Sequence, residues 1–216
     1  MIRIPSLFFS ILLIFIIVAC GYEPEVGLGV LHFEDDQTYR LNFHDHPDTA
    51  SRLAFYVDLR YDSLKRSIRT SLRKKDTLDF YPLYSISGAS IIVLQVLEQK
   101  GDWYRVITDD DVVPVSHWLY SPDQGMERWR WFFPKVKWVK TYDDQRNPLR
   151  EGPSPKARSY GLNRESVCLQ VLEVQGAWLK VKNTPERCPK APVIQEPFEG
   201  YLRWKKEGQI LVWFAL

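Results

Sequence analysis

Apolar and polar residues alternate along several short stretches of this 216-residue chain, the pattern of strands that bury one face. Two of the stretches are nearly identical: residues 94–106 read LQVLEQKGDWYRV and residues 169–181 read LQVLEVQGAWLKV. Eight of the thirteen positions match at a constant offset of 75. Each stretch alternates, turns at a glycine (Gly101, Gly176) and resumes at a tryptophan, so each predicts a β-hairpin. The chain is therefore expected to be mainly β, with an internal repeat.

The repeat extends to both sides of the hairpins. Upstream, residues 30–50 and 136–157 each contain an apolar strand, the letters DDQ, and a polar strand that ends in a proline turn. Downstream, residues 113–120 and 199–204 each contain a short aromatic strand. The proline turns align at an offset of 106, against 75 for the hairpins, so the first copy carries an insertion of 31 residues. Alternation places these hairpin residues toward the core: Ile92, Leu94, Val96, Val167, Leu169 and Val171.

The insertion falls at about residues 58–85 and is rich in charge. Its apolar residues Leu64, Ile68 and Leu72 are spaced as on one face of a helix, which predicts a short amphipathic helix. An extended hairpin is the alternative. Basic residues gather in the same segment: Lys65, Arg66, Arg69, Arg73, Lys74 and Lys75. We interpret them as the solvated face of the helix, with a contact to phospholipid headgroups as the alternative.

Three motifs of the second copy, in this order, resemble the bacterial SH3 (SH3b) domain: REGPS at residues 150–154, VLEVQGAWLKV at residues 171–181 and GYL at residues 200–202. The first copy has HDHPD, VLEQKGDWYRV and HWL, with His46 where the family usually has glycine. The resemblance implies a mainly β chain of two tandem small SH3-like β-barrels. They would occupy residues 28–122, insertion included, and residues 135–216, with a linker at residues 123–134. It also implies binding of peptidoglycan stem peptides or of partner proteins.

The first residues have the order of a secretion signal, with Arg3 before an apolar run from Leu7 to Ala19. The run ends Ile17-Val18-Ala19-Cys20, which resembles the lipobox of bacterial lipoproteins. In that family the signal, here residues 1–19, is removed and the cysteine, here Cys20, is lipidated; residues 20–27 would be a linker. The resemblance implies a lipid-anchored protein of the bacterial cell envelope. Gly21, in place of aspartate, favours the outer membrane facing the periplasm. An uncleaved anchor is the alternative.

Two cysteines remain once Cys20 is lipidated. In an exported protein, Cys168 and Cys188 predict one disulfide bond, with two unpaired thiols as the alternative. The bond would close a loop of about 20 residues and stabilise the fold by about 3 kcal/mol.

Charge and motif content narrow the function classes. The 29 basic and 27 acidic residues nearly cancel, so no nucleic-acid partner is expected. The sequence has no glycine-rich phosphate loop, no Gly-x-Ser-x-Gly elbow and no His-Glu-x-x-His motif, so we expect neither catalytic residues nor a cofactor. His44 and His46 could begin a zinc site. The aligned Arg150, Glu151 and Gly152 of the second copy could not, so we expect a solvated polar turn without metal.

Aromatic residues are the remaining candidates for binding. Six near the hairpins are predicted either to line a groove in each barrel or to belong to the core: Trp103, Tyr104, Trp118, Tyr120, Trp178 and Tyr201. Residues 127–140 read ERWRWFFPKVKWVK, and on a strand Trp129, Trp131 and Phe133 would share one face, with Arg128, Arg130 and Phe132 on the other. We interpret this segment as a linker packed between the barrels, because Val136 and Val139 belong to the repeat. A surface for sugar or an anionic polymer is the alternative.

These patterns predict a non-catalytic binding module that tethers the membrane, through its N-terminal lipid, to peptidoglycan or to envelope proteins. A structural or assembly subunit of an envelope complex, without wall binding, is the alternative.

Overall fold

A computed structural model describes residues 26–33, 39–62, 67–73, 80–85, 91–109, 113–160, 168–184 and 198–216. Several predictions fall on other residues. The signal peptide, the lipidation site Cys20, most of the 20–27 linker, Leu64, Val167 and Cys188 all lie outside the described ranges.

The described part of the chain is mainly β, as predicted. The strands are β1 (Gly29–Phe33), β2 (Tyr39–His44), β3 (Leu53–Asp62), β4 (Ser67–Arg73), β5 (Tyr84–Ser85), β6 (Ile92–Lys100), β7 (Trp103–Asp109), β8 (Val115–Tyr120), β9 (Glu127–Arg128), β10 (Trp138–Thr141), β11 (Leu169–Gln175), β12 (Trp178–Asn183), β13 (Glu199–Arg203), β14 (Lys205–Lys206), β15 (Gln209–Ile210) and β16 (Val212–Ala215). Two short helical turns, α2 (Trp129–Phe132) and the 3₁₀ turn η1 (Phe133–Lys135), stand between β9 and β10.

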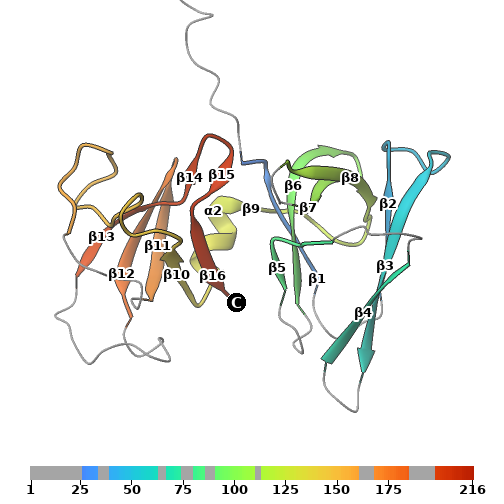
Figure 1. The fold of residues 1–216 in the computed structure, drawn as a ribbon, viewed down its shortest axis with the longest axis horizontal. Helices are drawn as coiled ribbons and strands as arrows, with labels where there is room; N and C mark the ends of the chain where they lie inside the picture. Colours follow the sequence, from blue (N-terminus) through green and yellow to red (C-terminus); the bar gives the residue numbers. More distant parts are fainter. Residues whose placement is uncertain are drawn as a thin grey trace, which may run out of the picture.

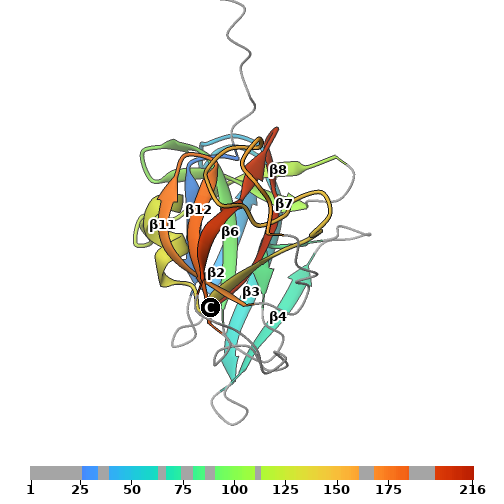
Figure 2. The ribbon, with the colours of Figure 1, turned by 90° about the vertical axis from the view of Figure 1, so that its left-hand side faces the viewer.

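The strands pair into two larger sheets and one small hairpin (Figure 1). The first sheet has the order β4-β3-β2-β8-β7-β6-β1-β9, with β5 also paired to β6. The second has the order β13-β12-β11-β10-β16, and β14 pairs with β15. In this pairing neither larger sheet closes on itself within the described residues. Figure 1 shows the two larger sheets side by side with α2 between them, and Figure 2 shows the second sheet in front of the first.

The repeat seen in the sequence is reproduced in the backbone pairing of the two hairpins. Both turns use a glycine with positive φ, 57° at Gly101 and 59° at Gly176, a conformation that glycine adopts without steric cost. Val96 pairs with Val106, and 75 residues later Val171 pairs with Val181. Each first strand then has a register shift at the same point, between Val96 and Glu98 and between Val171 and Glu173. The predicted hairpins are therefore confirmed, and the structure adds a β-bulge at the equivalent point of each, which was not predicted.

The order of the surrounding strands is repeated as well. His44, before the first proline turn, pairs with Trp118 of β8. Arg150, at the aligned position before the second turn, forms a bridge with Tyr201 of β13. Starting from the strand with the last aromatic motif, the two sheets then have the same order of equivalent strands: β8-β7-β6-β1-β9 in the first and β13-β12-β11-β10-β16 in the second. In each, the two strands of the glycine-turn hairpin come next, followed by the first strand of the copy and a final strand.

The helix predicted for the insertion is wrong for the part of it that the structure describes. Residues Ser67–Arg73 form the strand β4, paired antiparallel with β3 from Tyr56↔Arg73 to Asp62↔Ser67, so the alternative of an extended hairpin is confirmed here. The physical reason lies in the spacing of Ile68 and Leu72. Residues four apart share one face of a helix, but they share one face of a strand too, and the β-branched Ile68 and Thr70 favour a strand.

The segment after β8 also differs from its prediction. A strand would place Trp131 with Trp129 and Phe133, yet Trp129, Phe132 and Phe133 are buried whereas Trp131 is 59 % exposed. Positions 129, 132 and 133 follow the i, i+3, i+4 pattern of a helical turn. Pro134 favours this conformation, because proline is tolerated in the first turn of a helix and would cost a hydrogen bond inside a sheet.

Two apolar clusters fill the structure. The first sheet has its own cluster, built on buried residues such as Phe43, Leu94 and Val106. The other cluster joins Val30 and Val93 of the first sheet, and Val26 just before it, to the helical turn and to the second sheet. The Trp129 and Trp204 ring centroids lie 5.3 Å apart in it. Trp129, Phe132 and Phe133 thus pack between the two sheets, whereas the assignment of this segment as a linker between two barrels stays a prediction. The core-facing predictions for Ile92, Leu94, Val96, Leu169 and Val171 are confirmed too, since all are at most 5 % exposed.

Candidate functional site

Each half of the chain carries an outward sheet face made from equivalent positions of its repeat. In the first sheet, Phe43, Leu119, Tyr104 and Val106 point into the core, so their neighbours along each strand point outward. Strand register arranges the outward residues in two rows: His44, Trp118, Arg105 and Glu98 in one, and Tyr120, Trp103 and Lys100 in the next. We call this set face 1.

Aromatic rings and cations contact one another across face 1. The Trp103 ring lies at its centre, 5.4 Å from the His44 ring in an edge-on arrangement and 5.2 Å from the Tyr120 ring. The Lys100 ammonium lies 4.9 Å from the centre of the Trp118 ring, a cation–π distance. Tyr120 is 47 % exposed, Trp103 is half-buried and Trp118 is only 7 % exposed. Face 1 therefore presents Tyr120 and Trp103 to solvent, whereas Trp118 is almost fully covered.

Charges on face 1 are arranged around one carboxylate. Glu98 lies 3.1 Å from Lys100 Nζ and 3.2 Å from Arg105 Nε. These pairs are exposed by a third or more, so each adds little to stability. The two ion pairs hold the Lys100 and Arg105 side chains on face 1, beside its aromatic rings.

The second sheet repeats the arrangement with more positive charge. Its outward rows are Arg150, Tyr201, Lys180 and Glu173, then Arg203, Trp178 and Gln175; we call this set face 2. Arginine replaces both His44 and Tyr120 of face 1. The Arg203 guanidinium lies 5.9 Å from the Trp178 ring centre. Lys180 Nζ lies 2.9 Å from Glu199 Oε2, and this hydrogen bond, together with the negative charge of Glu199, raises the pKa of Lys180.

Five of the six predicted groove residues lie on these faces, namely Trp103, Trp118 and Tyr120 on face 1 and Trp178 and Tyr201 on face 2. The structure does not bring Tyr104 together with them. Tyr104 points into the core of the first sheet and is 5 % exposed, and Gln99 donates a hydrogen bond to its hydroxyl oxygen at 3.3 Å. Tyr104 is accordingly a packing residue.

The charged members of the faces were not singled out from the sequence. Lys100, Arg105, Lys180 and Arg203 share the outward side with the tryptophans because they occupy strand positions of the same parity in the paired register. The signal was present in the repeat, since Arg105 and Lys180 are 75 residues apart. That these cations lie beside the tryptophans can be recognised only once the strand pairing is known.

The predicted proline turn between two strands is confirmed in the first copy, and its histidines have structural contacts. Ser51 closes the turn by donating its hydroxyl to the His46 carbonyl oxygen at 3.0 Å, and His44 Nδ1 lies 3.3 Å from the Ser51 carbonyl oxygen. Among the residues that the structure describes, no group of three or more His, Cys, Asp or Glu side chains is placed to hold a metal ion. His44 instead contributes its ring to face 1.

Cys168 is buried at 3 % exposure and is disulfide-bonded. Cys20 and Cys188 lie outside the described residues, so the pairing of Cys168 with Cys188 stays a prediction. In the same described ranges, no helix is both long and apolar enough to cross a membrane.

Comparison of the chain with protein-family models, curated proteins and solved structures gives no match. Function is therefore inferred from the residues and their geometry.

Proposed function

We propose that the chain is a lipid-anchored protein of the bacterial cell envelope whose two SH3-like halves bind ligands without catalysis. It tethers the membrane, through lipid on Cys20, to peptidoglycan or to envelope proteins. The observation that carries the proposal is the presence of two outward faces, each built from a tryptophan, a second aromatic residue and cations at equivalent positions of the repeat. A purely structural repeat would need equivalent core residues only. Trp103, Tyr201, Arg105 and Lys180 lie on the outward side and are partly exposed, whereas Trp118 and Trp178 are 7 % and 9 % exposed.

The chemistry of the faces suits short peptides that carry carboxylates, such as peptidoglycan stem peptides. Aromatic side chains such as Trp103 and Tyr120 offer flat apolar surface to methyl groups and peptide planes. Nearby cations, Arg105 on face 1 and Arg203 on face 2, can pair with carboxylates. The SH3b-like motif order, the repeated strand order and the lipobox-like segment before Cys20 support the same assignment.

A structural or assembly role in an envelope complex is the second candidate. It is favoured by an exposed aromatic pair, one residue just after β10 and the other within β16, that belongs to neither face. Tyr142 and Trp213 are 48 % and 52 % exposed, and their ring centroids lie 4.6 Å apart. A pair of this kind suits the centre of a protein–protein contact, where aromatic side chains are enriched.

Co-sedimentation of the detergent-solubilised full chain with purified sacculi separates the two candidates. We expect the wild-type protein to pellet with sacculi, and the double variant Trp103→Ala, Tyr120→Ala to lose most of the pelleted fraction. Trp213→Ala is the matched control, because it removes an exposed tryptophan outside both faces. Circular dichroism checks that each variant is folded. A wild-type protein that stays in the supernatant would favour the assembly role instead.

The lipid anchor is tested separately. Cells grown with labelled palmitate should yield labelled wild-type protein and unlabelled Cys20→Ser. Label that persists in Cys20→Ser would contradict the anchor.

A further inference from the structure

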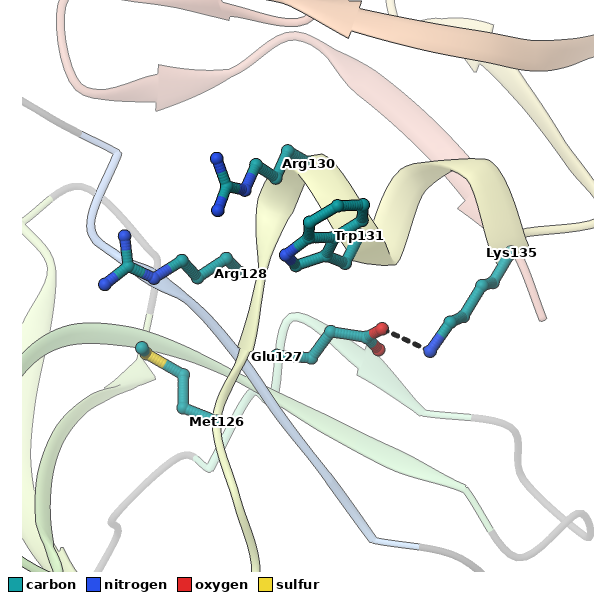
Figure 3. Close-up of a pocket in the computed structure, with 6 residues that line it drawn as sticks. All are labelled: Met126, Glu127, Arg128, Arg130, Trp131 and Lys135. Atoms are coloured by element: carbon teal, nitrogen blue, oxygen red, sulfur yellow. Dashed lines mark ion pairs between the residues drawn. The ribbon is translucent and has the colours of Figure 1, made fainter.

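An open depression of about 860 Å³ lies on the segment that joins the two halves (Figure 3). Its lining comes entirely from one stretch of chain: Met126, Glu127, Arg128, Arg130, Trp131 and Lys135. We call it the connector depression. Neither of the two proposed binding faces contributes a residue to it.

The connector depression stands on a fixed base. Gly29 lets β9 lie directly on β1, because a side chain at Gly29 would meet the Glu127 carbonyl oxygen at 2.1 Å. Trp129, Phe132 and Phe133 anchor the following turn in the apolar cluster shared by the sheets. Since those three residues point inward, the helical turn directs Trp131 outward, where 59 % of its surface meets solvent.

Charge around Trp131 is only partly neutralised. Lys135 forms an ion pair with Glu127. The structure shows no ion pair for Arg128 or Arg130 with any carboxylate of the described residues, and Figure 3 shows both guanidinium groups on the same side of the depression. The Arg130 guanidinium lies 4.8 Å from the Trp131 ring centre, a cation–π distance. Within the described residues, two guanidinium groups without a carboxylate partner thus lie beside one exposed indole.

We propose that the connector depression binds an anionic sugar, whose ring stacks on Trp131 while its phosphate or carboxylate is held by Arg128 and Arg130. A pyranose ring presents an apolar C–H face that suits an exposed indole. Guanidinium groups bind phosphate and carboxylate through paired hydrogen bonds. The Glu127–Lys135 pair supplies an acceptor and a donor for ring hydroxyls.

Other anionic ligands fit less well. A nucleic acid needs a continuous track of cations along its phosphates. The depression offers two arginines without a carboxylate partner among the described residues, and the whole chain has a net charge of +2. An acidic peptide is usually held by pockets for successive side chains or by a free sheet edge, and the depression is open and formed by a turn.

Two-dimensional NMR of the full chain in detergent tests the proposal through the indole N–H signal of Trp131, identified by its loss in Trp131→Leu. The probes are glucose 6-phosphate and glucuronate, which distinguish phosphate from carboxylate, with glucose and inorganic phosphate as the separate parts. We expect saturable shifts with at least one anionic sugar, at an affinity about tenfold higher than for either part alone. The double variant Arg128→Gln, Arg130→Gln should lower that affinity at least about tenfold.

Matched controls are Arg146→Gln, whose side chain is 90 % exposed elsewhere on the surface, and Trp213→Leu. Both should bind the anionic sugar as the wild type does. The proposal is overturned if neither anionic sugar shifts the Trp131 signal, or if inorganic phosphate alone binds as tightly. Tighter binding of a glutamate-rich peptide would overturn it in favour of an acidic peptide. Sacculus binding through the faces does not use these residues, so the two proposals can fail independently.

Discussion

Gly29→Ala tests whether close approach of β9 to β1 holds the two halves together. The added Cβ would lie 2.1 Å from the Glu127 carbonyl oxygen and 2.8 Å from the Arg128 Cα, both backbone atoms that cannot rotate away. Carbon atoms pack at about 3.5 Å, so β9 must move by about 1 Å or more. A shift of that size weakens the β1–β9 pairing at Gly29↔Arg128 and withdraws Trp129 from Val26 and Val30.

The expected cost follows from these contacts. Overpacking at a close backbone approach and the loss of a backbone hydrogen bond together destabilise by about 2–4 kcal/mol. Urea unfolding of the full chain, followed by tryptophan fluorescence, should then show a midpoint lowered by about 1–2 M for an m-value near 2 kcal/mol/M.

Gly125→Ala is the matched control, because a Cβ there meets nothing within 4 Å. It should change the free energy of unfolding by less than about 0.5 kcal/mol. Equal midpoints for Gly29→Ala and Gly125→Ala would refute the inference that β9 must lie against β1.

Three further predictions concern the core, the disulfide and a surface charge. Phe133→Ala should lower the free energy of unfolding by about 3–5 kcal/mol in the same assay, whereas Trp131→Ala should change it by less than about 0.5 kcal/mol. Similar losses for the two variants would mean that Trp131 and Phe133 share one buried face, as on a strand. Cys168→Ser should destabilise by about 3 kcal/mol, and peptide mapping of the unreduced protein should recover Cys168 linked to Cys188 rather than free. Because the pKa of Lys180 is raised above its ordinary 10.5 by Glu199, its stabilising contribution is present below that value and is lost as pH rises through the folded-state pKa. Lys180→Gln should therefore show a shallower loss of stability in thermal melts at alkaline pH, and an unchanged alkaline limb would count against the pair.

Local signals predicted the repeated hairpins, because alternation, a turn glycine and a strand-initiating tryptophan act within a dozen residues. They failed where one pattern fits two structures. The spacing of Ile68 and Leu72 suits a helix and a strand equally, and only pairing with β3 decides between them. The alternation around Trp131 predicted a strand, but the need to bury Phe132 and Phe133 together between the sheets produced a helical turn.

The candidate sites were likewise predictable only where neighbouring residues in the sequence decide the structure. Repeat position was enough to select Trp103 and Trp178, since a tryptophan opens the second strand of each predicted hairpin. Their cationic neighbours come from other strands, so Arg105 and Arg203 could be assigned only from the cross-strand register. Tyr104 shows the reverse error, because adjacent residues on a strand lie on opposite faces and only one of the Trp103–Tyr104 pair could face outward.

The apolar cluster shared by the two sheets has a consequence for how this duplicated chain could be divided. The repeat suggests two interchangeable modules, and a fragment that begins at Lys135 would contain the whole second copy. Such a fragment would lack Trp129, Phe132 and Phe133, and would leave Trp204 and Phe214 without the rings that cover them. Part of the interior of the second copy is thus supplied by the segment before it. We therefore expect the two copies to unfold as one cooperative unit, and a fragment that begins at Lys135 to be less stable than the same residues within the full chain.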